Sequence, residues 1–391
     1  MDNSFIPFHR PSIGTDEFAA VRRVLESKWL TTGQATHEFE SAFAEYIGAR
    51  HALAVNSGTA ALQLAAAAIG LQPGDEVLLP SFTFTATAEI ATYFGARPVL
   101  CDSVRCGFNI DALDAKRRIT SKTKAIIPVH IGGEPSNMAA IAALAADHGL
   151  HVIEDAAHAL PASFRGRRVG TISDLTAFSF YATKNITTGE GGMLVTDQDH
   201  YAEKARCMRL HGISGDAWKR YSREGSWYYE VQHAGFKLNL PDILGALGSA
   251  QLVKSDQFFR RRSEIAARYY ERFAKIEELE PPPVAGPGCE HSWHLFILRL
   301  RSGALKLGRA EFVEELKKRG IGAAVHFIPL HLHPYYTNTY GYRRGDFPNA
   351  EDAYARCFSL PIYPDLRDEE VERVIGSVAQ VVSAHRRKAV A

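Results

Sequence analysis

Short apolar runs alternate with longer helix-like segments through the first half of the chain. The runs are bounded by turn residues, which is typical of strands. They are Ala52–Val55, Glu76–Leu79, Arg97–Leu100, Lys124–Val129, Val152–Glu154 and Thr176–Phe180. Between the first two lies the alanine-rich segment Ala60–Ile69, which favours a helix. This alternation predicts an α/β fold in which helices pack on a mainly parallel sheet.

The N-terminal segment has the pattern of an amphipathic helix. Thr15, followed by Asp16 and Glu17, is typical of a helix start. We expect its buried stripe to consist of the apolar residues Phe18, Val21, Val24 and Leu25.

The second half of the chain contains the clearest domain boundary. After Pro241 the pattern is helical and rich in charge, and it ends at Pro281-Pro282-Pro283. We therefore expect a large α/β domain at 1–250 and a smaller α+β domain at 251–391, joined by a long helix at about 241–280. The run Trp293–Leu300 predicts the first strand of the smaller domain.

Composition excludes several classes of protein. The chain has 391 residues, 46% hydrophobic and 23% charged, as ordinary globular proteins do. Its 45 Lys and Arg nearly balance 44 Asp and Glu, so nothing favours nucleic-acid binding. The five cysteines form no CxxC pair and fit no complete disulfide framework. Because no signal peptide or membrane-length apolar run is present, we expect a cytoplasmic protein without a membrane partner.

A lysine and an aspartate stand after two of the predicted strands. Asp155 ends the run that begins at Val152, and Lys184 follows Thr176–Phe180. Because open α/β sheets bind ligands at the carboxyl ends of their strands, both side chains are expected at one sheet edge. A lysine that binds an aldehyde cofactor as a Schiff base needs a group that controls the electron demand of the ring. The pair therefore indicates pyridoxal phosphate, although such residues are also common without this role.

A third feature supports the same cofactor. Ser57-Gly58-Thr59 lies between the first predicted strand and the helix that follows it. A helix N-terminus offers unpaired N–H groups and a positive dipole, and glycine permits close approach of the backbone to a phosphate. The alternative is that Ser57 or Thr59 only caps the helix.

These features occur in the order found in fold-type I pyridoxal-phosphate enzymes, and the chain resembles the DegT/DnrJ/StrS type of sugar aminotransferase. The matching segments are Trp29 to Gly33, Ser57 to Leu62, Pro73 to Val77, Glu154 to Ala159, Ser179 to Gly192, Gly235 to Leu240 and Ser359 to Tyr363. The resemblance covers nearly the whole chain. It implies a mainly parallel seven-stranded sheet flanked by helices, plus a smaller C-terminal α+β domain.

The resemblance also implies roles for individual residues. Lys184 would be the catalytic Schiff-base lysine and Asp155 the catalytic partner of the pyridine nitrogen. Further cofactor contacts would come from Ser57, Gly58, Thr59, Phe84, His158, Ser179 and Asn239. For Phe84 the alternative is core packing. In the family a neighbouring subunit completes the phosphate site through the asparagine that Asn239 matches, so we expect a homodimer with shared sites; the alternative is that Lys237 and Asn239 cap the next helix.

Substrate contacts are expected from Thr31, Tyr181, Lys237, His331 and Tyr335. Arg209 and His211 are further candidates for binding anionic groups. The histidines His326, His331 and His333 have no acidic or cysteine partner at ligand spacing, so no metal site is predicted.

The resemblance implies transfer of an amino group from L-glutamate to a keto group of a nucleotide-linked deoxysugar, with an amino sugar as the product. Such products serve surface polysaccharides or secondary metabolites. Gly189-Glu190-Gly191-Gly192 resembles members that act at sugar C4, and Asp216 to Tyr221 with Trp227 to Tyr229 favours the same position.

Four alternatives remain at this point. Two are amination at C3 and amination of a keto-cyclitol. A third is sugar dehydration, which is disfavoured because dehydrating members have replaced the lysine by histidine. The fourth is a regulatory or scaffold protein with the same fold.

Overall fold

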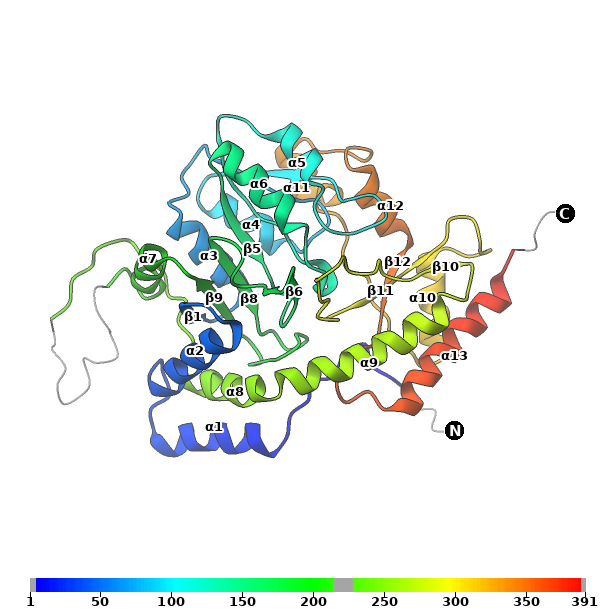
Figure 1. Cartoon of the computed structure of the whole chain (residues 1–391), viewed down its shortest axis with the longest axis horizontal. Helices are drawn as coiled ribbons and strands as arrows, with labels where there is room; N and C mark the ends of the chain where they lie inside the picture. Colours follow the sequence, from blue (N-terminus) through cyan, green and yellow to red (C-terminus); the bar gives the residue numbers. More distant parts are fainter. Residues whose placement is uncertain (1–4, 214–227, 388–391) are drawn as a thin grey trace.

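The computed structural model of the chain describes residues 5–213 and 228–387. Its centre is a seven-stranded sheet with the order β1-β9-β8-β5-β4-β2-β3 (Figure 1). The strands are β1 (His51–Val55), β2 (Glu76–Pro80), β3 (Arg97–Cys101), β4 (Thr123–Ile126), β5 (His151–Asp155), β8 (Leu175–Ser179) and β9 (Gly192–Thr196). The predicted fold class, a mainly parallel seven-stranded sheet flanked by helices, is confirmed.

The sheet is parallel except at one strand. β9 runs antiparallel to both of its neighbours, β1 and β8, whereas the pairs β5–β8, β4–β5, β2–β4 and β2–β3 are parallel. The six strands predicted from apolar runs are present. β9 was not predicted, although its run Met193–Val195 is apolar and every residue of the strand is buried.

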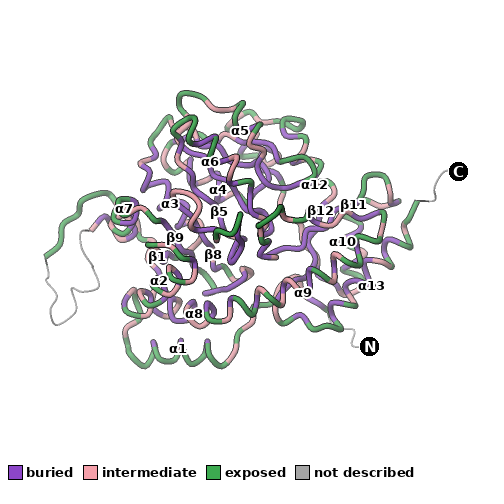
Figure 2. The backbone as a smooth tube through the Cα atoms, in the orientation of Figure 1, coloured by how far each residue is buried: buried purple, intermediate pink, exposed green. Residues whose placement is uncertain are grey.

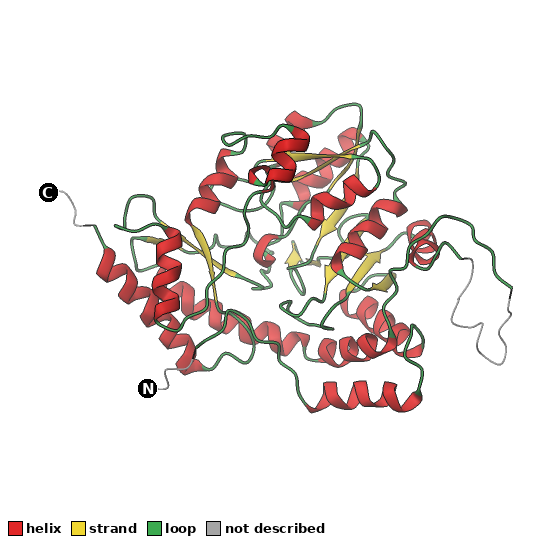
Figure 3. Cartoon of the chain, turned by 180° about the vertical axis from the view of Figure 1, so that it is seen from behind, coloured by secondary structure: helices red, strands yellow, loops and turns green. Residues whose placement is uncertain are grey.

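Helices cover both faces of this sheet (Figure 3). Along β1, Leu53 and Val55 pack with α3 (Gly58–Ala68), whereas Ala54 packs with α2 (Gln34–Ile47). The α3 face also carries α4 (Ala86–Tyr93) and α7 (Asp199–Arg209), and the α2 face carries α5 (Ala112–Arg118) and α6 (Met138–His148). The strands are accordingly the most buried part of the backbone (Figure 2).

The region predicted as one long helix consists of two helices. α8 (Asp242–Val253) and α9 (Ser255–Phe273) meet at Lys254 and run from beneath the large sheet to the C-terminal part of the chain (Figure 1). The helical region ends at Phe273, short of the predicted end at about 280, and Leu279 and Glu280 instead form β10, which pairs with a strand of the second sheet.

The N-terminal helix begins where the sequence predicted, but its buried stripe differs. α1 (Thr15–Ser27) buries Ala20 and Val24 against α8, whereas Phe18 and Leu25 are 63% and 53% exposed. The expectation that both would be buried is therefore wrong for this chain by itself. Glu17 takes a buried place instead, because its carboxylate accepts hydrogen bonds from the Lys254 amine and the Gln251 amide.

The C-terminal part is built on a second, antiparallel sheet. Its strands are β10 (Leu279–Glu280), β11 (Phe296–Leu300) and β12 (Cys357–Leu360). A separate short hairpin, outside this sheet, consists of β6 (Ser163–Phe164) and β7 (Arg167–Arg168). The second sheet is accompanied by the helices α10 (Arg309–Lys318), α11 (Pro334–Tyr340), α12 (Pro348–Arg356) and α13 (Asp368–His385). The apolar faces of α9, α10 and α13 meet around β11 and β12. Within the described ranges, no helix is both long and apolar enough to cross a membrane.

Candidate active site

A cavity of about 460 Å³ lies at the carboxyl ends of β5 and β8. Asp155 reaches it from the end of β5, and Ser179 from the end of β8. Nine of the predicted cofactor and substrate residues line it together: Ser57, Gly58, Thr59, Phe84, Asp155, His158, Ser179, Tyr181 and Lys184. The prediction that strand ends would bring the lysine and the aspartate to one sheet edge is met by this geometry.

Lys184 lies in the loop between β8 and β9. Its backbone N–H donates to the Tyr181 carbonyl at 2.9 Å, and the next residue, Asn185, is buried and donates from Nδ2 to the Leu160 and Ser292 carbonyls at 2.6 and 3.0 Å. The loop therefore holds the lysine in a fixed place. Burial lowers the pKa of Lys184 to about 8, while the negative charge of Asp155 acts in the opposite direction. A large share of this amine is neutral, and thus nucleophilic, at mildly alkaline pH.

Asp155 is held by two donors. Its Oδ2 accepts from the Thr87 hydroxyl at 2.8 Å, and its Oδ1 accepts from the Ala157 N–H at 3.1 Å. Burial raises the pKa of this carboxyl, while the two hydrogen bonds and the charge of Lys184 lower it. A buried carboxylate facing a cavity is the group expected to pair with a protonated pyridine nitrogen.

The start of α3 lines the cavity at the segment for which the sequence predicts phosphate binding. Ser57 is the N-cap, since its Oγ accepts from the Ala60 N–H at 3.0 Å, so the capping role is real. The N–H groups of Gly58 and Thr59 stand in the first turn, where an α-helix has no earlier carbonyl to accept from them. A Cβ at Gly58 would lie only 2.7 Å from the Ser179 Cβ, so glycine is required where α3 meets β8. These groups fit the phosphate of pyridoxal phosphate at one end of the cavity, with Lys184 and Asp155 farther in.

Aromatic rings form the remaining walls. Phe84 is 58% exposed and lines the cavity, so core packing is not its role within this chain. His158 is stacked on Phe327 with ring centroids 5.7 Å apart and lies 4.3 Å from the His294 ring. Its Nδ1 accepts from the Gly132 N–H at 3.2 Å, and burial lowers the pKa of His158 well below its usual range. His158 therefore contributes a neutral, stacked ring to the cavity wall.

Five predicted residues do not line the cavity of their own chain: Thr31, Lys237, Asn239, His331 and Tyr335. Lys237 and Asn239 are paired at 2.5 Å, and Asn239 Nδ2 donates to Thr32 Oγ1 at 2.6 Å. Thr31 is exposed in the same neighbourhood, where its carbonyl accepts from the Asp242 N–H. Tyr335 lines an adjacent groove of about 760 Å³, which shares Thr83, Phe84 and Phe327 with the cavity.

His331 is placed differently from the expectation of a substrate contact. It is fully buried, its Nδ1 lies 2.6 Å from the Ser81 hydroxyl, and its Nε2 lies 3.0 Å from the Glu351 carboxylate. Both ring nitrogens are thus used inside the protein. Arg209 is also buried, and its guanidinium pairs with Glu40 and donates to the Ala54 carbonyl.

Several cavity residues were given no role of their own, although the resemblance implies that the stretch His326 to Tyr336, which begins with one of them, faces the substrate. Phe8 comes from the N-terminal segment, His294 from the approach to β11, and His326 from the loop before α11. Burial lowers the pKa of His326 to about 4, and its Nδ1 lies 3.1 Å from the Ser359 hydroxyl. Glu190 also lines the cavity and lies within a segment that the resemblance had matched. For Phe8 and His294 the sequence carried no local signal.

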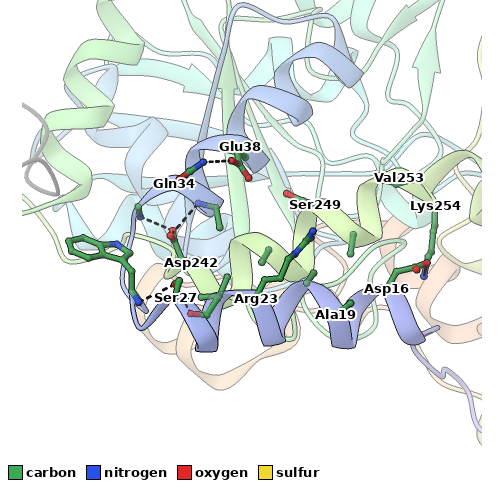
Figure 4. A pocket seen from close by; sticks show the side chains of 17 residues that line it. Asp16, Ala19, Arg23, Ser27, Gln34, Glu38, Asp242, Ser249, Val253 and Lys254 are labelled. Carbon is green, nitrogen blue, oxygen red and sulfur yellow. Dashed lines mark hydrogen bonds and ion pairs between the residues drawn. The ribbon is translucent and has the colours of Figure 1, made fainter. Parts of the chain in front are cut away.

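A larger groove of about 890 Å³ lies elsewhere, between α1 and α8 (Figure 4). The Asp242 carboxylate in it is used for structure, because it accepts from the Gly33 N–H and the Thr36 hydroxyl, both at 2.7 Å, and so caps α2. Lys254 on its rim is paired with Asp16 at 3.0 Å. Asp16 and Lys254 are therefore engaged with each other and Asp242 with the start of α2, whereas the smaller cavity holds the predicted lysine and aspartate.

Together the sheet and the cavity define a fold-type I pyridoxal-phosphate enzyme. The chain belongs to the DegT/DnrJ/EryC1/StrS aminotransferase family, whose profile matches residues 11–379. The expected family, the enzyme class and the cofactor are thereby confirmed, and a purely regulatory or scaffold protein is not favoured.

Three relatives illustrate this membership. The Bacillus subtilis spore coat polysaccharide biosynthesis protein SpsC is 48% identical over 381 residues, which cover 97% of this chain and 98% of SpsC. Spr1654 from Streptococcus pneumoniae, solved in its PLP form, superposes with a TM-score of 0.91 at 32% identity, covering 97% of this chain and 99% of that one. Helicobacter pylori PseC, an aminotransferase involved in pseudoaminic acid biosynthesis, has a TM-score of 0.89 at 30% identity, with coverage of 97% and 100%.

The lowered pKa of Lys184 gives a testable pH dependence. Only the neutral amine attacks the aldehyde, so below a pKa of about 8 each pH unit removes about nine tenths of the reactive form. We expect the rate of cofactor attachment to the apoprotein to rise about tenfold from pH 6 to 7 and to level off above about pH 8. Stopped-flow absorbance after mixing apoprotein with pyridoxal phosphate measures this rate. A tenfold rise per unit continuing to pH 10 would mean an ordinary lysine of pKa 10.5.

Proposed function

We propose that the protein transfers an amino group from L-glutamate to a keto group, at C4, of a nucleotide-linked deoxysugar. The observation that carries the proposal is the convergence of Lys184, Asp155 and the start of α3 on one cavity. We infer a sugar as the amino acceptor from the family, since the relative SpsC acts in polysaccharide biosynthesis. The products are an amino sugar and 2-oxoglutarate. With five free cysteines, the chain also suits the reducing cytoplasm.

Each part of the cofactor has a partner in the cavity. Gly58 and Thr59 would offer N–H groups and Ser179 a hydroxyl to the phosphate, Asp155 would pair with the ring nitrogen, and Lys184 would bind the aldehyde carbon. When bound, pyridoxal phosphate supplies a carbonyl that accepts an amino group and a ring that withdraws electrons from the carbon losing its proton.

The chain's own groups then move the proton. The Lys184 amine lies inside the cavity, and its lowered pKa suits it both to take the α-proton of the amino donor and to return it. The negative charge of Asp155 would favour a proton on the ring nitrogen of the bound cofactor. His158 and Phe327 stack on each other and line the cavity, which reduces the room for water there. The second half of the reaction runs the same steps backwards on the keto-sugar, which predicts ping-pong kinetics.

The position of amination rests on one motif in the described part of the chain. Glu190, in the Gly189–Gly192 segment, lines the cavity, where its carboxylate can accept hydrogen bonds from sugar hydroxyls. Residues 216–221 and Trp227, which favoured C4 on resemblance, lie outside the described residues. Amination at C3 or of a keto-cyclitol is the alternative, since either would use the same cofactor residues.

Absorbance spectroscopy tests the proposed function directly. The purified protein with pyridoxal phosphate should lose the band of the lysine-bound aldehyde on addition of L-glutamate and gain the band of the amine form. The amine form is then offered a nucleotide-linked 4-keto sugar, its 3-keto isomer or a keto-inositol, and return of the first band identifies the acceptor. A bound cofactor that ignores glutamate but responds to glutamine would contradict the proposed donor, and a response confined to keto-inositol would contradict the sugar.

The proposed active form is a homodimer in which Asn239 completes the phosphate site of the partner subunit. Asn239 is half-buried and lies outside its own cavity, and its side chain is held from both sides by Thr32 and Lys237. Two hydrogen bonds of this kind fix the amide without using its second N–H, which remains for a phosphate oxygen.

Subunit mixing tests the shared site. Lys184→Ala subunits and Asn239→Ala subunits should each form weakly active or inactive dimers, but a mixed dimer has one intact site, made of Lys184 from one subunit and Asn239 from the other. With random exchange, half of the dimers are mixed and half of their sites are intact, so activity should recover to about a quarter of wild type. Turnover measured before and after exchange would show no recovery if each chain built its own complete site.

A further inference from the structure

Two buried threonine hydroxyls lie in line behind the Asp155 carboxylate. Thr87, in the first turn of α4, is fully buried, and its Oγ1 lies 2.8 Å from Asp155 Oδ2. Thr83 Oγ1 lies 2.9 Å from Thr87 Oγ1, and Thr83 itself is 2% exposed and lines the cavity. The sequence reading gave neither residue a role. The row Thr83, Thr87, Asp155 therefore connects the cavity wall with the carboxylate that faces the ring nitrogen.

The protons in this row have only one arrangement while Asp155 is ionised. A carboxylate accepts hydrogen bonds and donates none, so Thr87 must give its single proton to Asp155. The Thr87 oxygen then has lone pairs only, and Thr83 must donate to it. A helical threonine often donates to a carbonyl one turn back, but this hydroxyl donates to Asp155 instead.

We propose that Thr87, with Thr83 behind it, is a positioning residue that keeps Asp155 ionised and aimed at the ring nitrogen. The proposal deepens the proposed function, because it rests on the role given there to Asp155. Two donors in line inside a dry site polarise each other and favour the charged carboxylate over the protonated one. They act against burial, which raises the pKa of Asp155 and so favours its protonated form.

The other charged or titratable groups that face Asp155 are Lys184, from the loop after β8, and His130, from the loop after β4. Both ring nitrogens of His130 have other partners, because Nε2 lies 2.8 Å from the Glu154 carboxylate and Nδ1 accepts from the Ser136 N–H at 3.0 Å. Within the described part of the chain, the Thr87 side chain is hydrogen-bonded to Thr83 and Asp155 and to neither of these two groups. A change at Thr87 therefore acts on Asp155 directly.

The test is the pH dependence of affinity for pyridoxamine phosphate, which cannot react with Lys184. Affinity should fall at low pH as Asp155 becomes protonated. Thr87→Val keeps the shape of the side chain but removes the donor, so the pKa of Asp155 should rise and the fall should begin about one pH unit higher, with about tenfold weaker binding on the acidic side. Isothermal titration calorimetry from pH 5 to 9 measures these curves.

Two further variants separate positioning from structure. Thr87→Ser restores the hydroxyl and should restore the wild-type midpoint. Thr83→Val leaves the contact between Thr87 and Asp155 in place. It should shift the midpoint in the same direction as Thr87→Val but by a smaller amount. This second variant also tests the proposal if Thr87→Val does not fold. A Thr87→Val curve parallel to that of wild type, weaker by the same factor at every pH, would overturn the proposal. An unmoved midpoint in Thr83→Val would overturn the part given to Thr83.

Asp155→Asn separates this inference from the proposed function. Protonation of the ligand's phosphate, at about pH 6, contributes to the acidic fall in every variant. If Asp155 faces the ring nitrogen, Asp155→Asn should lose the rest of the fall that wild type shows. A variant whose fall matches that of wild type would refute the role of Asp155, and with it the proposed site. If Asp155→Asn loses that part of the fall while Thr87→Val matches wild type, only the role of Thr87 is refuted.

Discussion

Lys184→Ala is expected to lower transamination by at least about 10⁴-fold, because the variant loses both the nucleophile that binds the cofactor and the base that moves the α-proton. The protein should still fold and bind pyridoxal phosphate. The start of α3 and Ser179 remain in place, and Asp155, although it loses the facing charge of Lys184, keeps its hydrogen bonds from Thr87 and Ala157.

The measurement combines an absorbance spectrum with a single turnover in the presence of L-glutamate. The variant should bind the cofactor as a free aldehyde, without the band of the lysine-bound form, and should produce no 2-oxoglutarate on the timescale of wild type. Lys122→Ala is the matched control, since Lys122 is exposed and remote from the cavity lining. Normal turnover in Lys184→Ala would mean that another lysine is catalytic.

The sequence predicted the parts of the site that depend on local pattern. An apolar run followed by a polar residue marks a strand end, and parallel strands bring their ends to one edge, so Asp155 and Lys184 could be placed together before the structure was known. The start of α3 was also predictable from a short local pattern, because a glycine between a strand and a helix allows a ligand to approach the unpaired N–H groups of the first turn. Each of these features is contained in a few consecutive residues.

Residues that arrive from distant segments could not be predicted in this way. The loop before α11 supplies His326 to the cavity and turns His331, five positions later, into the interior between Ser81 and Glu351. Both histidines stand in similar apolar surroundings in the sequence, and only packing decides which of them faces the cavity. Phe8 and His294 likewise reach the site through tertiary contacts alone.

The wrong prediction for the buried face of α1 has a related cause. Helical periodicity identifies which residues share a face, but the partner element decides which face is buried. Here α8 presents Ala246 and Ala250, and the small side chain of Ala20 fits closely against them, while Phe18 and Leu25 face outward. Lys254, at the end of α8, forms an ion pair with Glu17, which stabilises this glutamate in its buried position.

Asp155→Asn is expected to slow the first half-reaction by about 10²–10³-fold or more while some cofactor remains bound. Asparagine keeps the size of the side chain and can still accept from Thr87, but it carries no charge to hold a proton on the ring nitrogen. The ring then withdraws electrons less strongly, and removal of the α-proton becomes harder. Binding suffers less because the start of α3 and Lys184 are untouched.

The rate is measured in single turnovers with L-glutamate and with its α-deuterated form. If proton removal is the affected step, the kinetic isotope effect should increase as the rate falls. Asp102→Asn is the matched control, because Asp102 is a buried carboxylate at the same sheet edge, after β3, but it accepts from the Asn349 and Ala350 N–H groups of α12. That variant should lose stability and keep its half-reaction rate. Equal rates in Asp155→Asn and wild type would show that the ring does not depend on Asp155, whereas a selective loss ties the charge of this one carboxylate to the proton transfer at Lys184.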